Sequence, residues 1–176
     1  MAKHTPLRIA VMAAAALALP GLASASDRAF FEQIDGVWSG PGEIVAGKYK
    51  GTRFTCTLTG ASESAKPGMR LDGSCRVGLF SQAISARIAR KGRSYGGQFL
   101  DGAAGKGLDV VSGNVHGDRV VVGMERAELS GAMVARVKPN GKLGVTVSVR
   151  VEDELVPVIG IDLSRKLDRN AVGSVR

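Results

Sequence analysis

The sequence predicts an all-β, single-domain fold: an antiparallel meander of about eight to ten strands that closes into a barrel, with a short N-terminal helix. Three observations lead to this prediction. From about residue 37 to residue 164, short runs rich in Val, Ile, Thr and aromatic residues alternate with Gly, Asn, Asp or Lys clusters. Glycine makes up 24 of the 176 residues, about twice its usual ~7% share, which suits tight turns and strand bends. Two cysteines fall on the apolar faces of neighbouring predicted strands.

The first residues have the pattern of an export signal. "MAKHTPLR" is basic and contains no acid, "IAVMAAAALAL" is apolar, and "GLASAS" places Ala23 and Ala25 at the A-x-A spacing of a signal-peptidase site. We predict cleavage after Ala25 and a periplasmic or secreted protein. The apolar run is too short to span a bilayer core of ~30 Å as a helix, so no transmembrane segment is predicted. The chain then divides into a signal peptide (1–25), a barrel domain (26–166) and a flexible tail (167–176).

The barrel domain begins with a short helix over residues 26–34, which Ser26 or Asp27 can cap. Its apolar residues share one side: Phe30, Phe31 and Ile34. Strands are predicted at 37–45, 51–59, 68–77, 79–90, 94–100, 106–115, 118–125, 130–138, 141–151 and 154–164. Short connections make sequential strands antiparallel neighbours, and a meander of this size usually closes because closure removes the exposed edges.

The two cysteines test the register of the second and third strands. Cys56 shares a face with Phe54 and Leu58, and Cys75 shares a face with apolar residues of the next strand. In an oxidising compartment such a pair predicts a disulfide between adjacent strands, worth ~3 kcal/mol. A metal site is disfavoured, because zinc takes three or four ligands and the mature chain has one histidine, His116.

Residues for catalysis are nearly absent. His116 lies in "NVHGDR", a predicted turn, and the acidic "VEDEL" is expected to be another solvated turn. No glycine-rich loop leads from a strand into a helix, as a phosphate site requires. We therefore predict a non-enzymatic protein with no cofactor and no metal.

The predicted interior suits an apolar ligand. The inward positions are Phe54, Phe80, Tyr95, Phe99, Val145 and Ile161. They favour a lipid-like small molecule if the barrel is hollow, whereas a filled core is the alternative. No aromatic residue follows Phe99, so a base-stacking surface is poorly supported and no nucleic-acid partner is predicted.

Alternate turns of a meander lie at the same end, and one end of the predicted barrel is basic. Its cations include Arg90, Lys91, Arg93, Lys138 and Lys142. With a formal net charge of +8 for the whole chain, this end is a candidate surface for an anionic envelope component. The alternative is that Lys and Arg simply populate exposed turns.

The order of Gly36, Trp38, a meander and then Arg165 or Lys166 is similar to the calycin pattern of lipocalins and avidins. This resemblance implies a barrel in which the tryptophan closes one end and the cation lies across its ring. The chain also resembles a family of small secreted alphaproteobacterial proteins. That likeness rests on the stretch from Phe31 to Gly42, the cysteine pair, "RKGRSYGG" and "IDLSR", and it implies no particular activity.

Together these features predict a periplasmic protein that binds a lipid-like ligand or the cell envelope. The alternative is a protease inhibitor that acts through residues 26–31 or 61–67, or another envelope-interaction protein without a ligand cavity. The sequence sets no oligomeric state.

Overall fold

The computed structural model describes residues 21–100 and 107–166. Most of the predicted signal peptide and the predicted tail lie outside the described residues. The elements in chain order are α1 (Gly21–Glu32), β1 (Gly36–Ile44), β2 (Arg53–Ser62), β3 (Gly68–Val77), β4 (Phe80–Lys91), β5 (Ser94–Leu100), β6 (Leu108–His116), β7 (Arg119–Arg126), β8 (Leu129–Lys138), β9 (Lys142–Val151) and β10 (Glu154–Arg165).

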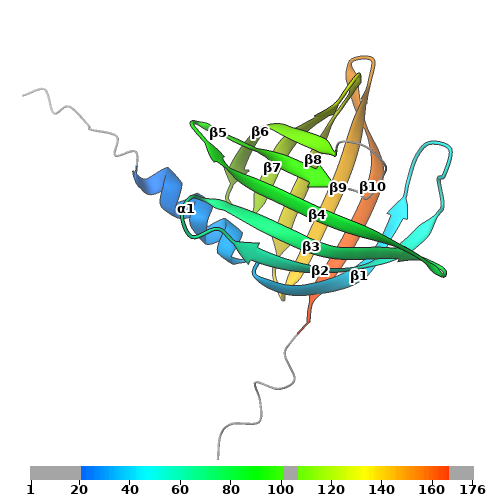
Figure 1. The fold of residues 1–176 in the computed structure, drawn as a ribbon, viewed down its shortest axis with the longest axis horizontal. Helices are drawn as coiled ribbons and strands as arrows, with labels where there is room; N and C mark the ends of the chain where they lie inside the picture. The colour runs from blue at the N-terminus through cyan, green and yellow to red at the C-terminus, as the bar shows by residue number, and fades with distance from the viewer. Residues whose placement is uncertain (1–20, 101–106, 167–176) are drawn as a thin grey trace, which may run out of the picture.

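The strands form a closed antiparallel barrel (Figure 1). Each strand pairs with the next one along the chain, and β1 pairs with β10 to close the sheet. The predicted fold class is therefore confirmed. The predicted helix starts too late, because α1 begins at Gly21 rather than at the capping residues Ser26 and Asp27. The predicted cleavage point after Ala25 thus falls inside α1.

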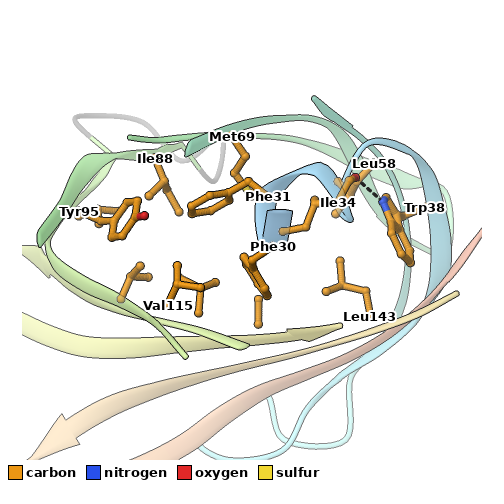
Figure 2. Packing of buried hydrophobic residues seen from close by; sticks show 14 of the residues in the cluster. Phe30, Phe31, Ile34, Trp38, Leu58, Met69, Ile88, Tyr95, Val115 and Leu143 are labelled. Carbon is orange, nitrogen blue, oxygen red and sulfur yellow. Dashed lines mark hydrogen bonds between the residues drawn. The ribbon is translucent and has the colours of Figure 1, made fainter. Parts of the chain in front are cut away.

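The interior follows the period-two alternation of the strands. Trp38, Cys56, Leu58, Ile88 and Val122 are among the fully or nearly fully buried side chains. The C-terminal half of α1 adds Phe30 and Phe31, and the turn after it adds Ile34; all three pack among the strand residues (Figure 2). The rings of Phe30 and Phe31 meet edge to face at 5.3 Å, and Phe31 lies 5.4 Å from Tyr95. The helix is therefore part of the barrel core.

The predicted disulfide is present. Cys56 and Cys75 lie directly opposite each other in the β2–β3 pairing and are bonded. Both side chains face the interior, Cys56 fully buried and Cys75 half-buried. The bond therefore joins adjacent strands on their inner face, as the alternation predicts.

The two ends of the barrel differ. At the end that we call the helix end lie α1 and the turns 63–67, 92–93, 117–118 and 139–141, and α1 contacts β2, β3 and β6. At the opposite end, which we call the far end, lie the β1–β2 loop and the turns 78–79, 127–128 and 152–153. Figure 1 shows α1 at one extreme and the β1–β2 loop and β3–β4 tip at the other.

Candidate functional site

Trp38 closes the helix end. Its side chain is fully buried, and its indole Nε1 donates a hydrogen bond to the Ile34 carbonyl at 2.7 Å (Figure 2). The Arg165 guanidinium lies 4.5 Å from the ring centroid, so Arg165 is the cation across the indole. Lys166 instead pairs its backbone amide with the Val37 carbonyl. The expectation drawn from the Gly-x-Trp pattern is met by Arg165.

Arg165 also fixes the chain between α1 and β1. Its guanidinium donates to the backbone carbonyls of Gln33 and Asp35. Gly36 has a φ of 108°, and a Cβ at this position would lie 2.9 Å from an Arg165 nitrogen. The glycine of the Gly-x-Trp motif is thus required by the left-handed backbone and by the close approach of the arginine.

A buried polar cluster anchors α1 to the barrel wall. Asp27 is only 6% exposed and is the one buried charged side chain among the described residues. The Tyr95 hydroxyl donates to Asp27 Oδ2 at 2.6 Å, and Arg90 lies 3.4 Å from the same oxygen. Arg90 also lies 5.9 Å from the Tyr95 ring centroid. We call Asp27, Tyr95 and Arg90 the helix anchor. Tyr95 and Arg90, which were assigned to binding surfaces from the sequence, therefore hold α1 in place.

Burial raises the pKa of Tyr95 well above its usual range, and the hydrogen bond to Asp27 raises it further. The folded protein thus keeps a neutral phenol, while the unfolded phenol ionises near pH 10. Tyr95 therefore stabilises the fold fully below about pH 10, and this contribution is lost as the pH rises above that value, by about 1.4 kcal/mol per pH unit.

Replacing Tyr95 with Phe should remove this part of the alkaline decline, because no phenol is left to titrate. It should also lower the free energy of unfolding by about 1–3 kcal/mol at pH 8, since buried Asp27 loses a donor. Urea unfolding of both proteins at pH 8, 10 and 11 measures the two effects. Tyr49→Phe is the matched control, because Tyr49 is exposed. Equal alkaline slopes in Tyr95→Phe and the native protein would contradict the assignment.

Burial of the interior side chains is lower in the middle and toward the far end of several strands. Several inward side chains in its middle and far part are apolar yet only half-buried: Phe54, Leu71, Ile84, Leu108, Met133, Val145, Val147 and Ile161. Phe99, another predicted interior residue, is half-buried as well. By contrast, the inward residues nearest α1, such as Ile88 and Leu163, are almost completely buried. The interior is thus largely packed next to α1, whereas in its middle and far part half-buried side chains alternate with buried ones such as Val110 and Met124.

Phe80 does not line the interior, so this part of the prediction is wrong. It is 84% exposed and stands at the start of β4, beside the two-residue β3–β4 turn. Strand alternation assigned Phe80 to the correct face of β4. The Val77–Phe80 pair lies on the same face as the Cys75–Gln82 pair, but nearer the tip of the hairpin. β3 and β4 extend beyond the rim of the barrel, so no other strand faces Phe80 there.

The predicted basic patch is not one surface. Lys138 forms an ion pair with Asp162 at 2.9 Å, and Lys142 donates to Ser164 at 2.8 Å. Lys91 and Arg93 are exposed at the β4–β5 turn, which the β6–β7 turn separates from Lys138 and Lys142. With Arg90 in the helix anchor, the helix end presents scattered cations.

The outer wall carries shallow grooves. One of them, of about 510 Å³, lies over β4 and β5 beside the β2–β3 turn, where Arg87 pairs with Glu63 at 3.1 Å. His116 is exposed at the β6–β7 turn, and its neighbour Asp118 lies 3.6 Å from Arg136. Among the described residues, no three His, Cys, Asp or Glu side chains gather as metal ligands would.

The architecture defines a ten-stranded antiparallel β-barrel protein with a helix packed into one end. Among solved structures, the chain is similar to the crystal structure of Rv2717c from M. tuberculosis, with a TM-score of 0.59 and 14% sequence identity. The match covers 80% of this chain and 98% of that chain, and at this identity it shows the fold alone. No family model and no curated protein matches the chain. In the part of the chain that the structure describes, no helix has the length and apolar character needed to cross a bilayer.

Proposed function

We propose that the protein is a non-enzymatic binding protein that takes an apolar, lipid-like small molecule into the barrel through the far end. The observation that carries this proposal is the half-exposure of the interior apolar side chains there. A side chain on the inner face of a closed sheet reaches solvent only through the barrel interior. Half-exposed inner residues in the middle of the barrel, such as Met133 and Val147, therefore favour a ligand space over a filled core.

The chemistry of these walls selects the ligand class. They are aliphatic, thioether and phenyl groups, which bind a ligand through buried apolar area. Arg126 follows Val122 and Met124 on the inward positions of β7 and lies at the far end, half-buried. A cation at the mouth of an apolar space favours a lipid with an acidic head group.

The proposal includes a periplasmic or secreted location. The Cys56–Cys75 bond supports it, because structural disulfides persist in oxidising compartments. The basic leader with its A-x-A site supports it from the sequence.

Replacing Val147 with Phe tests the ligand space. Val147 faces the interior of β9 and is half-buried, so a larger side chain should fill the space with little loss of stability. We expect the affinity for dansyl-labelled undecanoic acid, followed by fluorescence, to fall about tenfold or more. Thr146→Phe is the matched control, because Thr146 is the exposed neighbour on the outer face.

A filled core gives the opposite result. In that case the native protein does not enhance dansyl fluorescence, and Val147→Phe costs about 1–3 kcal/mol through overpacking. Native mass spectrometry of the protein purified from its own cells adds a direct readout, because a co-purifying mass identifies the ligand class.

A further inference from the structure

The far end carries most of the large hydrophobic side chains that the described surface exposes. They lie in or beside its turns: Val45, Tyr49, Val77, Leu79, Phe80, Leu100, Leu129, Val151 and Leu155. Elsewhere on the described surface the exposed large hydrophobics are Val37, Val111 and Val121. Turn tips are usually built from Gly, Asn, Asp and Ser, and apolar side chains gathered at one end indicate a contact surface.

The β3–β4 hairpin is the most prominent part of this surface. Leu79 is 99% exposed and Phe80 is 84% exposed. The turn itself is Gly78–Leu79, flanked by the pair Val77 and Phe80, and Gly78 has a φ of 56°. Glycine at the first turn position satisfies the backbone of a two-residue hairpin. The turn geometry therefore explains Gly78 and leaves Leu79 and Phe80 without a structural role.

The tip is held firmly. Cys75, two residues before Val77, is bonded to Cys56 on β2 and pairs with Gln82 on β4. The base of the hairpin is thus tied to the neighbouring strand. A rigid tip presents Leu79 and Phe80 without the entropy cost of ordering a loop on binding.

Cations lie at the apolar tip and in the next loop along the rim of the far end. Arg76 precedes Val77 and is exposed, and the neighbouring β1–β2 loop carries Lys48 and Lys50. Between these lysines stands Tyr49, 63% exposed, with the Lys48 ammonium 5.5 Å from its ring centroid. The acidic turns of the far end carry Glu128, Glu152 and Asp153, and the β9–β10 turn flanks the β1–β2 loop on the side away from the β3–β4 hairpin. An apolar tip, an exposed aromatic ring and nearby cations are the side-chain types that bind the interface of an anionic bilayer.

We propose that the far end docks on an anionic phospholipid leaflet, with Val77, Leu79 and Phe80 inserted and Lys48, Lys50 and Arg76 at the head groups. This moves the envelope contact away from the helix end, where the sequence placed it. The proposal does not depend on a ligand inside the barrel. An anionic lipid surface is the partner that fits an apolar tip with cations at its base and in the next loop.

Sedimentation with vesicles tests the docking. We expect the native protein to bind vesicles of phosphatidylglycerol and phosphatidylcholine, and Leu79→Ser/Phe80→Ser to lower the partition coefficient by about 10- to 100-fold. The matched control is Val111→Ser/Val121→Ser, which removes two exposed apolar side chains from the outer wall and should bind like the native protein. Both double variants should unfold at the native temperature, because the replaced side chains are exposed.

Two further variants sharpen the test. Lys48→Gln/Lys50→Gln should weaken binding to phosphatidylglycerol vesicles and not to pure phosphatidylcholine vesicles. Phe80→Trp should add a fluorescence band that shifts to the blue when vesicles are added, because the indole enters the acyl region. Native binding that the Leu79→Ser/Phe80→Ser variant retains, or no native binding at all, would overturn the proposal. So would light scattering that shows a native dimer converted to monomer by that variant, since the tip would then be a subunit interface.

Discussion

Replacing Trp38 with Ala is expected to lower the free energy of unfolding by about 3–5 kcal/mol, the largest effect of any single side chain at the helix end. Trp38 is fully buried, and its removal leaves a cavity between α1 and the barrel wall. The Ile34 carbonyl also loses its donor, and Arg165 loses the ring on which it lies. The variant therefore loses the buried ring, the hydrogen bond and the cation–ring contact together. We expect the loss of unfolding free energy to lie in the upper part of this range.

Urea unfolding followed by circular dichroism measures this change, because Trp38 is the single tryptophan and its fluorescence disappears with it. Val37→Ala is the control, since Val37 precedes Trp38 and is exposed. It should change the free energy of unfolding by no more than about 0.5 kcal/mol. Trp38→Phe should fall between the two, because it keeps an aromatic ring and lacks the indole donor. An unfolding midpoint that Trp38→Ala leaves unchanged would show that α1 does not depend on the indole.

The fold and the disulfide were predictable because they rest on short-range patterns. Period-two alternation identifies an inner face on each strand, and it placed Cys56 and Cys75 on that face. Glycine and polar clusters mark the turns, so the predicted strand ends agree with the structure to within three residues. The Gly-x-Trp motif led to Arg165 because strands one and ten of a ten-stranded meander meet at closure.

The helix anchor was not predictable, because it joins residues far apart in sequence. Asp27 and Tyr95 are 68 positions apart, and Asp27 by itself is typical of a helix cap. Phe80 shows a different limit. Alternation gives the face of a side chain but not the point at which a hairpin passes the barrel rim. Arg90 illustrates a third limit, since the sequence does not distinguish an exposed turn cation from the ion-pair partner of a buried carboxylate.

Replacing both cysteines with Ser is expected to lower the free energy of unfolding by about 3 kcal/mol and the melting temperature by roughly 6–12 °C. The two cysteines are 19 positions apart, so the bond closes a loop of moderate length in the unfolded chain. The folded strands should change little, because Cys56 and Cys75 already lie opposite each other in the β2–β3 ladder. Thermal unfolding of the double variant, beside the native protein with and without a reductant, measures the effect.

Because Cys56 and Cys75 lie opposite each other in the folded sheet, the cysteine variants can show whether the bond acts on the unfolded chain. If the bond acts through the unfolded chain, the reduced native protein and the double Ser variant should lose similar stability, and their circular dichroism spectra should match that of the oxidised protein. Cys56 is completely buried, so any extra loss in the Ser variant reports the burial of a hydroxyl on the inner face. Cys56→Ala/Cys75→Ala separates the two causes, because alanine removes the bond without adding a polar group. A loss below about 1 kcal/mol in the Ala variant would contradict this account. It would mean that the turn at 63–67 already brings the two strands together in the unfolded chain. The main role of the bond would then be to hold the base of the β3–β4 hairpin.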